Sequence, residues 1–310
     1  DDYVYTADGL RDALNHVAPG GLLSISYSAM EDYLSKRIAA NLRIATGDKI
    51  KPVIFKKRET SVWHLMAPVT PEQKAKIDAL ASKGFADYSD MDTEGVRPST
   101  DDWPFLYLNP TAFDPLYLGV NVLVLALAWL ACGKRVRANA NAARWQLFFL
   151  GSGFLLLELS IIDRLALVFG TTWLVNSICI LSVLIAIILS NMAIIKKPDL
   201  YKPKILYAGL IITLIATYFT PLERFTSIGM VVGGTIAAIF SAIPIFFAGL
   251  IFSGSFNKEK TPSVGLAFNM LGAVIGGLLE YVATYTGIRS LMLIAIVIYG
   301  ISFLCMLKIG

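Results

Sequence analysis

Cysteine and histidine are scarce in this sequence, and no motif uses them for chemistry. The 310 residues include three cysteines and two histidines. Cys132, Cys179 and Cys305 are widely spaced and form no CxxC pair, which argues against a redox or zinc role and predicts small buried side chains. His16 and His64 have no Cys, His or Ser at a catalytic or metal-binding spacing. The HExxH, Walker A, GxSxG and CxxCH patterns are also missing, so we expect no metal site.

Charged residues are also few. They make up 16% of the chain, whereas hydrophobic residues make up 55%. Globular domains average about 25% charged and about 45–50% apolar residues. The net charge of +4 is small and scattered, which gives no basis for a nucleic-acid partner. This composition indicates an integral membrane protein whose main partner is the lipid bilayer.

Long apolar runs follow one another from residue 115 to the end of the chain. A helical run of about 20 apolar residues spans a bilayer core. We therefore expect residues 115–310 to form a bundle of about seven spans, the fourth of which is short, in a mostly α-helical membrane protein. The runs are Pro115–Cys132, Gln146–Gly170, Trp173–Ile195, Ile205–Phe219, Ile228–Phe252, Val264–Thr286 and Leu291–Leu307.

Basic residues cluster after the first, third and fifth of these runs. If every run crosses the membrane once, these loops share one side, and the positive-inside rule makes that side cytoplasmic. Residues 1–114 would then lie on the non-cytoplasmic side. The clustered residues are Lys134, Arg135, Arg137, Arg144, Lys196, Lys197, Lys202, Lys204, Lys258 and Lys260.

Residues 1–114 read as a separate α/β domain with short elements. Thr6 or Asp8 is expected to cap its first helix. An acidic connector, Asp87–Glu94, should follow the last helix. The expected elements are a helix over Thr6–Val17, a strand over Leu22–Tyr27, a helix over Ala29–Ala45, strands over Val53–Phe55 and Val62–Met66, and a helix over Pro71–Lys83.

The second run carries ionisable residues inside a membrane span, Gly151–Gly170. A charge at the bilayer centre costs at least about 2.5–3.5 kcal/mol, so such residues face protein or water. Asp163 and Arg164 are placed to form ion pairs with neighbouring helices. Glu158 lies nearer the centre and has three interpretations: a neutral packing carboxyl, a group that handles substrate or protons, or one half of an ion pair with Arg164 of another subunit or a nearby basic residue.

The sixth run has polar and small residues on one face. Asn269, Gly272, Gly276 and Glu280 fall at i, i+3, i+7 and i+11. The favoured interpretation is helix packing, because glycines let another helix approach closely. The alternative is one polar cavity in the membrane, lined by Glu158, Asn176, Asn269 and Glu280.

The string TDDWPFLYL, residues 100–108, joins the domain to the first span. Asp101 and Asp102 are candidates for capping or binding. Trp103, Phe105 and Tyr107 suit a membrane interface, where aromatic side chains are enriched. We favour the anchoring role.

Several strings resemble a known family. YVYTADGLRDALNHVAPGGLLSIS, residues 3–26, resembles the last third of a Rossmann-like S-adenosylmethionine-dependent methyltransferase domain. The nearer resemblance is to membrane proteins that are spermidine synthase-like, in which such a domain is followed by a TDDWPF-like string and several spans. Residues 149–176, 243–252 and 268–291 also look like that family. The resemblance covers most of the chain.

This resemblance implies the C-terminal part of a Rossmann-like domain before the bundle, and a transferase. The implied cofactor is S-adenosylmethionine or its decarboxylated form, and the implied reaction is methyl or aminopropyl transfer, the latter in polyamine synthesis. Tyr3 and Tyr5, with Asp101 and Asp102, would lie at the edge of the ligand pocket. The glycine-rich turn, the acidic ribose-binding residue and the catalytic Asp of that family would all precede Asp1, so the cofactor-binding half is expected upstream.

Three functions therefore remain open from the sequence. The first is the transferase, if an upstream cofactor half exists. The second is a non-catalytic accessory subunit of a membrane complex, which would bind other membrane subunits through its small-residue helix faces. The third is a transporter with Glu158 and Glu280 as an intramembrane carboxylate pair.

Overall fold

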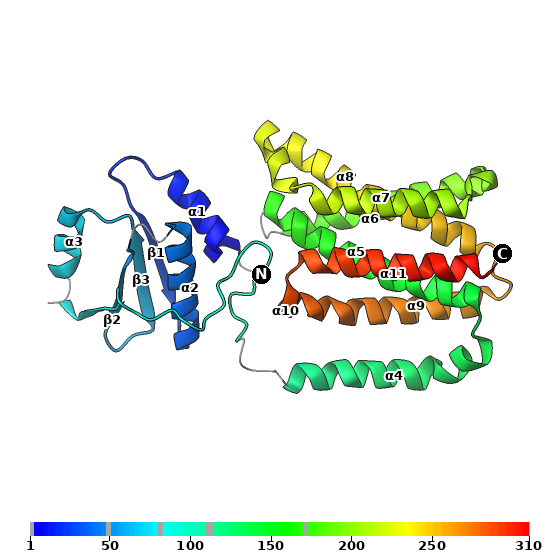
Figure 1. Cartoon of the computed structure of the whole chain (residues 1–310), viewed down its shortest axis with the longest axis horizontal. Coiled ribbons are helices and arrows are strands. Elements are labelled where there is room, and N and C mark those ends of the chain that lie inside the picture. The colour runs from blue at the N-terminus through cyan, green and yellow to red at the C-terminus, as the bar shows by residue number, and fades with distance from the viewer. Residues whose placement is uncertain (1–2, 48–50, 80–82, 110–114, 170–172, 310) are drawn as a thin grey trace. The chain divides into compact units, whose positions relative to one another are not determined.

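The computed structural model divides the chain into two compact units, Asp1–Phe113 (unit 1) and Asp114–Gly310 (unit 2). It describes residues 3–47, 51–79, 83–109, 115–169 and 173–309. Unit 1 contains a small sheet with helices, and unit 2 is helical (Figure 1). The expected order, an α/β segment followed by a helical membrane bundle, is confirmed at this level.

Unit 1 is built on a four-stranded antiparallel sheet in the order β1-β3-β2-β4. The expected strand pair is confirmed as β2 and β3, which pair from Val53↔Met66 to Lys56↔Trp63. β4 was not predicted, because it has only three residues and the last of them, Asp87, begins the stretch that we expected to be an acidic connector. The strands are β1 (Leu23–Ser28), β2 (Val53–Lys57), β3 (Val62–Ala67) and β4 (Phe85–Asp87).

Three α-helices accompany the sheet: α1 (Ala7–Asn15), α2 (Asp32–Ala45) and α3 (Pro71–Asp78). Thr6 caps α1 as expected, because its side chain accepts a hydrogen bond of 3.0 Å from the Gly9 N–H. Thr70 and Gln73 form a capping box at the start of α3. α3 ends earlier than expected, at Asp78, and the rest of the predicted helix reaches residues outside the described ranges.

The core of unit 1 lies between one face of the sheet and the helices α1 and α2. Alternate strand residues, among them Ile25 and Leu65, pack with Ile38 and Leu42 of α2. The serines at the intervening positions of β1 are exposed. This period-two pattern is typical of an antiparallel sheet with one face in the core and one in water.

The described residues of unit 2 form seven apolar helices that correspond to the seven predicted runs. Six are long and apolar enough to cross a membrane by length and composition, and α7 is shorter. The helices are α4 (Pro115–Asn139), α5 (Ala142–Phe169), α6 (Trp173–Lys196), α7 (Pro203–Phe219), α8 (Met230–Phe256), α9 (Pro262–Leu279) and α11 (Arg289–Leu307). Short segments η3 (Pro198–Leu200), η4 (Leu222–Ile228), η5 (Glu280–Val282) and α10 (Ala283–Thr286) complete the unit.

Helix α5 is the centre of this bundle. It packs against α6, α8, α9 and α11 (Figure 1). All of these except α6 are distant from α5 in the sequence. Its contact with α9 is the closest. A Cβ added to Gly272 would lie 1.9 Å from the Phe148 carbonyl oxygen, and one added to Gly276 would lie 2.3 Å from that of Ser152. The packing interpretation of the glycine face is therefore confirmed.

The same contact corrects the idea that this glycine face binds another subunit. Gly272 and Gly276 both face the backbone of α5 in the same chain. A face that is already filled by a backbone has no room for a second helix. Association with other subunits would have to use another surface.

Candidate functional site

The helices of unit 2 run alternately in opposite directions, which brings the basic loops to one end. α5 and α7 run in the same direction, because Gln146 contacts Tyr207 near their starts and Arg164 contacts Thr217 near their ends. α8 runs in the opposite direction, since Ser255 near its end meets Gln146. The basic residues at and beyond the C-terminal ends of α4, α6 and α8 therefore gather at the end of unit 2 where the C terminus lies (Figure 1), which we call the basic end.

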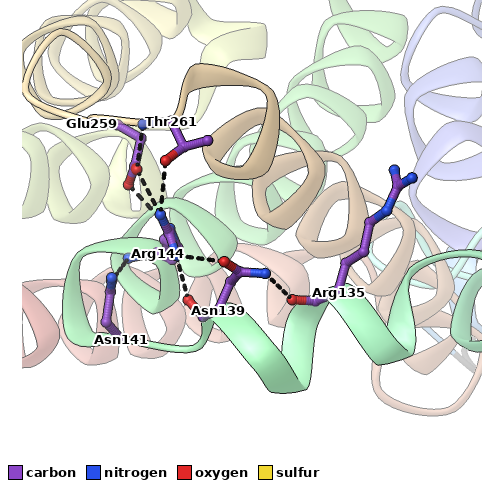
Figure 2. A network of polar contacts seen from close by, with 6 residues as sticks. All are labelled: Arg135, Asn139, Asn141, Arg144, Glu259 and Thr261. Atoms are coloured by element: carbon purple, nitrogen blue, oxygen red, sulfur yellow. Dashed lines mark hydrogen bonds and ion pairs between the residues drawn. The ribbon is translucent and has the colours of Figure 1, made fainter.

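At the basic end, an ion-pair network joins α5 to the α8–α9 loop (Figure 2). The Arg144 guanidinium donates two hydrogen bonds to the Glu259 carboxylate, of 3.3 Å from Nε and 3.0 Å from Nη2. Arg144 also donates to the Asn139 carbonyl, at 2.7 Å, and to the Thr261 hydroxyl, at 3.3 Å. The pair is largely buried, with side-chain exposures of 12% for Arg144 and 5% for Glu259. It links the end of α4, the start of α5 and the start of α9.

The environment of Glu259 favours its charged form. Burial, the largest influence, would raise the pKa of Glu259. Hydrogen bonds from Arg144 and from the Thr261 N–H, together with the positive charge of Arg144, outweigh burial and hold the pKa of Glu259 below its ordinary value. Removing one partner of such a buried ion pair strongly destabilises the folded state, because the other charge stays buried without compensation.

Replacing Glu259 with alanine should destabilise unit 2 by about 3 kcal/mol at neutral pH, because the Arg144 charge would remain buried without its partner. The unfolded carboxyl titrates near 4.5, and the folded pKa is lower. The pair therefore stabilises the protein above pH 4.5, and this stabilisation is lost as the pH falls through the folded pKa. Thermal unfolding in detergent across this pH range should show the acid loss for the wild type and a shallower loss for the variant.

Lys260→Ala is the matched control, since Lys260 is exposed on the same loop. It should keep both the neutral-pH stability and the acid dependence of the wild type. A Glu259→Ala variant that unfolds at the wild-type temperature would contradict this account of the network.

A cavity of about 550 Å³ lies beside this network, between the ends of α5, α7, α8 and α11. We call it the basic-end cavity. Apolar residues from α5 and the end of α11 form part of its wall. Its polar lining residues are Gln146, Tyr201, Lys204, Ser255, Lys258 and Glu259.

Hydrogen bonds organise the polar side of the basic-end cavity. The Ser255 hydroxyl accepts from Gln146 Nε2 at 2.9 Å and bonds the Tyr201 hydroxyl at 2.8 Å. Gln146 also donates to the Tyr207 hydroxyl, which bonds Ser302. The Lys258 ammonium lies over the Tyr201 ring, 4.6 Å from its centroid. Sequence reasoning missed this site, because its residues come from four helices and only the lysines stood out.

Arg164 binds backbone carbonyls of a neighbouring helix. We expected it to be placed for an ion pair with such a helix; its guanidinium donates hydrogen bonds of 2.6 Å to the carbonyls of Thr217 and Thr220. These carbonyls lie at the C-terminal end of α7, where backbone acceptors have no partner within the helix. Arg164 is buried and so caps α7 inside the bundle.

The described cavity that Asn269 lines does not include the two glutamates. Asn269 donates to the Leu147 carbonyl at 2.9 Å and lines a cavity of about 220 Å³ together with Gly151 and Asn191. The described lining of that cavity includes neither Glu158 nor Glu280. The reason is depth: residues on one helix face that are eleven apart, such as Asn269 and Glu280, lie about 16 Å apart along the axis.

The carboxylates themselves lie further along the α5–α9 pair. Gly272 lies against Phe148 and Gly276 against Ser152, so the two helices run in parallel and Glu280 lies at a depth near that of Glu158. Both glutamates are partly buried. Asp163 of α5 lies close enough to Glu280 for their charges to interact. The side chain of Asn176 lies outside what the structure describes.

In unit 1 the TDDWPFLYL string is part of the fold. Trp103 is 3% exposed and lies between two guanidinium groups, 5.1 Å from that of Arg37 and 4.3 Å from that of Arg97. The expectation that Trp103 anchors the chain at a membrane interface is therefore wrong. Arg37 is fully buried and donates to the carbonyls of Arg97 at 2.9 Å and Leu108 at 2.7 Å. Burial lowers the pKa of Arg37 to about 10, so it stays charged at neutral pH.

The four residues expected at a pocket edge lie in this same part of unit 1. The Thr6 hydroxyl has one hydrogen to donate and lies within hydrogen-bond distance of two acceptors, Asp101 at 2.7 Å and the carbonyl of Tyr3 at 2.9 Å. The Tyr5 carbonyl accepts from Asn41 at 2.7 Å. Asp102 lies near Arg97 and interacts with its charge. Tyr3, Tyr5 and Asp101 are thus brought together at the start of α1.

The described residues contain no group of three His, Cys, Asp or Glu side chains placed to hold a metal ion. His64 bonds the Ser26 hydroxyl at 2.7 Å and stacks on Phe55 in the sheet.

Comparisons with protein-family models, with curated proteins and with solved structures found no match for this chain.

Proposed function

We propose that this chain is the membrane-embedded part of a transferase that resembles the spermidine synthase-like proteins and uses S-adenosylmethionine or its decarboxylated form. The observation that carries the proposal is the free edge of β1. Among the described strands, β1 pairs only with β3. Doubly wound sheets commonly end in an antiparallel edge strand. A cofactor-binding half would extend the sheet from the other side of β1.

The position of Tyr5 supports a ligand site at this edge. Its ring meets that of Tyr27, near the C-terminal end of β1, with 6.5 Å between the ring centroids. Ligands of open α/β sheets bind beyond the carboxyl ends of the strands. Tyr5, with Asp101 nearby, would form the edge of the cofactor or acceptor pocket, and the remaining ligand contacts would come from the cofactor half.

The test is cofactor binding by the complete natural protein, purified in detergent and titrated with each cofactor by calorimetry. We expect one of the two to bind, and Tyr5→Ala to weaken binding at least about tenfold, or about 1.4 kcal/mol. Tyr107→Ala is the matched control, because Tyr107 is 65% exposed. If the complete protein binds neither cofactor, or if both variants bind like the wild type, the transferase proposal fails.

A non-catalytic accessory subunit is the second candidate, and two observations favour it. α4 is the least buried of the long apolar helices that the structure describes: 11% of its most apolar stretch is buried, against 22–56% for the others. α4 therefore offers a surface to lipid or to a partner helix. The basic end, if cytoplasmic, would also place unit 1 outside, away from the compartment that makes S-adenosyl cofactors. A monomer without co-purifying subunits, seen by native mass spectrometry, would count against this candidate.

A further inference from the structure

The basic-end cavity has an excess of positive charge. Lys204 and Lys258 line it and are exposed enough to move toward a ligand. Glu259 is the one acidic residue in its described lining, and its carboxylate already accepts two hydrogen bonds from Arg144. The lysine charges are therefore not cancelled by the lining, and the cavity favours an anion.

The cavity also offers oriented hydrogen-bonding groups behind the lysines. Gln146 is 1% exposed and donates a hydrogen bond to the Ser255 hydroxyl, which is also hydrogen-bonded to the Tyr201 hydroxyl. The Tyr201 ring carries the Lys258 ammonium on its face. These groups are held in place before a ligand arrives, which lowers the entropic cost of binding.

The rest of the described lining is largely apolar. Leu147, Met306 and Leu307 contribute side chains from α5 and α11 to the same cavity. A cavity with a cationic rim, hydroxyl groups and an apolar wall matches an amphiphile with an anionic head. Its volume of about 550 Å³ is within the range of small-molecule sites, about 300–1,000 Å³.

We propose that the basic-end cavity binds a phosphate-bearing amphiphile, namely the headgroup of an anionic phospholipid together with the first part of its acyl chains. Lys204 and Lys258 pair with the phosphate. Of the Tyr201 and Ser255 hydroxyls, the one that accepts the hydrogen bond between them donates its own hydrogen to the phosphate. Leu147 and the end of α11 contact the acyl chain. Basic pockets between transmembrane helices bind anionic headgroups in this way. The site is separate from the cofactor pocket proposed above and does not depend on it.

The test compares two double variants of the full chain in neutral detergent. Lys204→Gln/Lys258→Gln removes the cavity lysines. Lys197→Gln/Lys260→Gln removes the same charge from exposed residues at the same end that do not line the cavity. Native mass spectrometry and thermal unfolding would be measured with phosphatidylglycerol, with phosphatidylcholine, and with glycerol 3-phosphate or inorganic phosphate as headgroup probes without acyl chains.

We expect phosphatidylglycerol to bind and stabilise the wild type and the Lys197/Lys260 variant, and the Lys204/Lys258 variant to bind at least about tenfold more weakly. Phosphatidylcholine should bind weakly to all three. Binding of the water-soluble probes as strong as that of the lipid would overturn the amphiphile part of the proposal in favour of a free phosphate. Equal losses in the two variants would overturn the site, because they would indicate non-specific attraction to the basic end.

Discussion

Replacing Gly272 with alanine should destabilise unit 2 by about 3 kcal/mol, which is at the upper end for overpacking a close contact. The added Cβ would lie 1.9 Å from the Phe148 carbonyl oxygen and 2.7 Å from its carbonyl carbon. Those atoms belong to the backbone of α5, which cannot turn aside as a flexible side chain does. α5 and α9 would have to separate, and the contacts of the central helix would be lost along with them.

Gly300→Ala is the matched control. Gly300 also lies inside a membrane helix, α11, but nothing lies within 4 Å of a Cβ built on it. Alanine is more favourable than glycine in a helix by about 1 kcal/mol, so this variant should be as stable as the wild type or more so. The two variants would be compared by thermal unfolding in detergent. Equal tolerance of both substitutions would mean that α5 and α9 are not in contact at Gly272.

Replacing Arg164 with leucine should cost about 3 kcal/mol or more, because it leaves buried carbonyls without donors. α7 has 17 residues, a length of about 26 Å, which is less than the hydrocarbon thickness of about 30 Å. Its C-terminal carbonyls meet the buried Arg164 inside the bundle. The Arg164 guanidinium supplies two hydrogen bonds there and a positive charge where the helix dipole is negative.

Arg224→Leu is the control for this substitution. Arg224 lies on η4 at the same end of unit 2, and its side chain is exposed. It should unfold at nearly the wild-type temperature. Arg164→Lys should restore only part of the stability, because an ammonium lacks the planar fork that reaches both carbonyls. An Arg164→Leu protein as stable as the wild type would contradict the capping role.

The helices of unit 2 were predictable because their signal is local. Each run is long, apolar and bounded by charged or turn-forming residues, so the sequence indicated seven helices and the short length of α7. The glycine spacing of Gly272 and Gly276 predicted close packing for the same reason. The partner of that face was not predictable, since nothing near these glycines in sequence identifies α5.

The polar contacts were less predictable because their partners are distant or are backbone atoms. Arg164 bonds carbonyls more than 50 residues away, and a carbonyl has no sequence signature. Glu259 lies 115 residues from Arg144. The one local feature of the sequence there is an acidic residue between two lysines. The spacing of Asn269 and Glu280 predicted one helix face, but periodicity says nothing of depth, and Glu280 lies in η5, beyond the end of α9.

In unit 1, too, features with a local signal were predictable, whereas long-range contacts were not. The strands β2 and β3 and the Thr6 cap follow from alternation and capping preferences. Trp103 was misread, because an aromatic residue beside a membrane span is typical of an interface. Its burial depends on Arg37, more than 60 residues earlier, which binds the carbonyls of the string that contains it.

The central claim is that the helices of unit 2 alternate across a membrane, so that the basic end and the opposite end of unit 2 lie on different sides. It is tested most directly by labelling with a membrane-impermeant maleimide in intact cells. Cysteine would be placed at Lys197, at the basic end, or at Ser227, on η4 at the other end, in a chain without its native cysteines; both residues are exposed. We expect position 197 to react from one side of the membrane and position 227 from the other. Reaction of both positions from the same side would contradict the alternation of the helices.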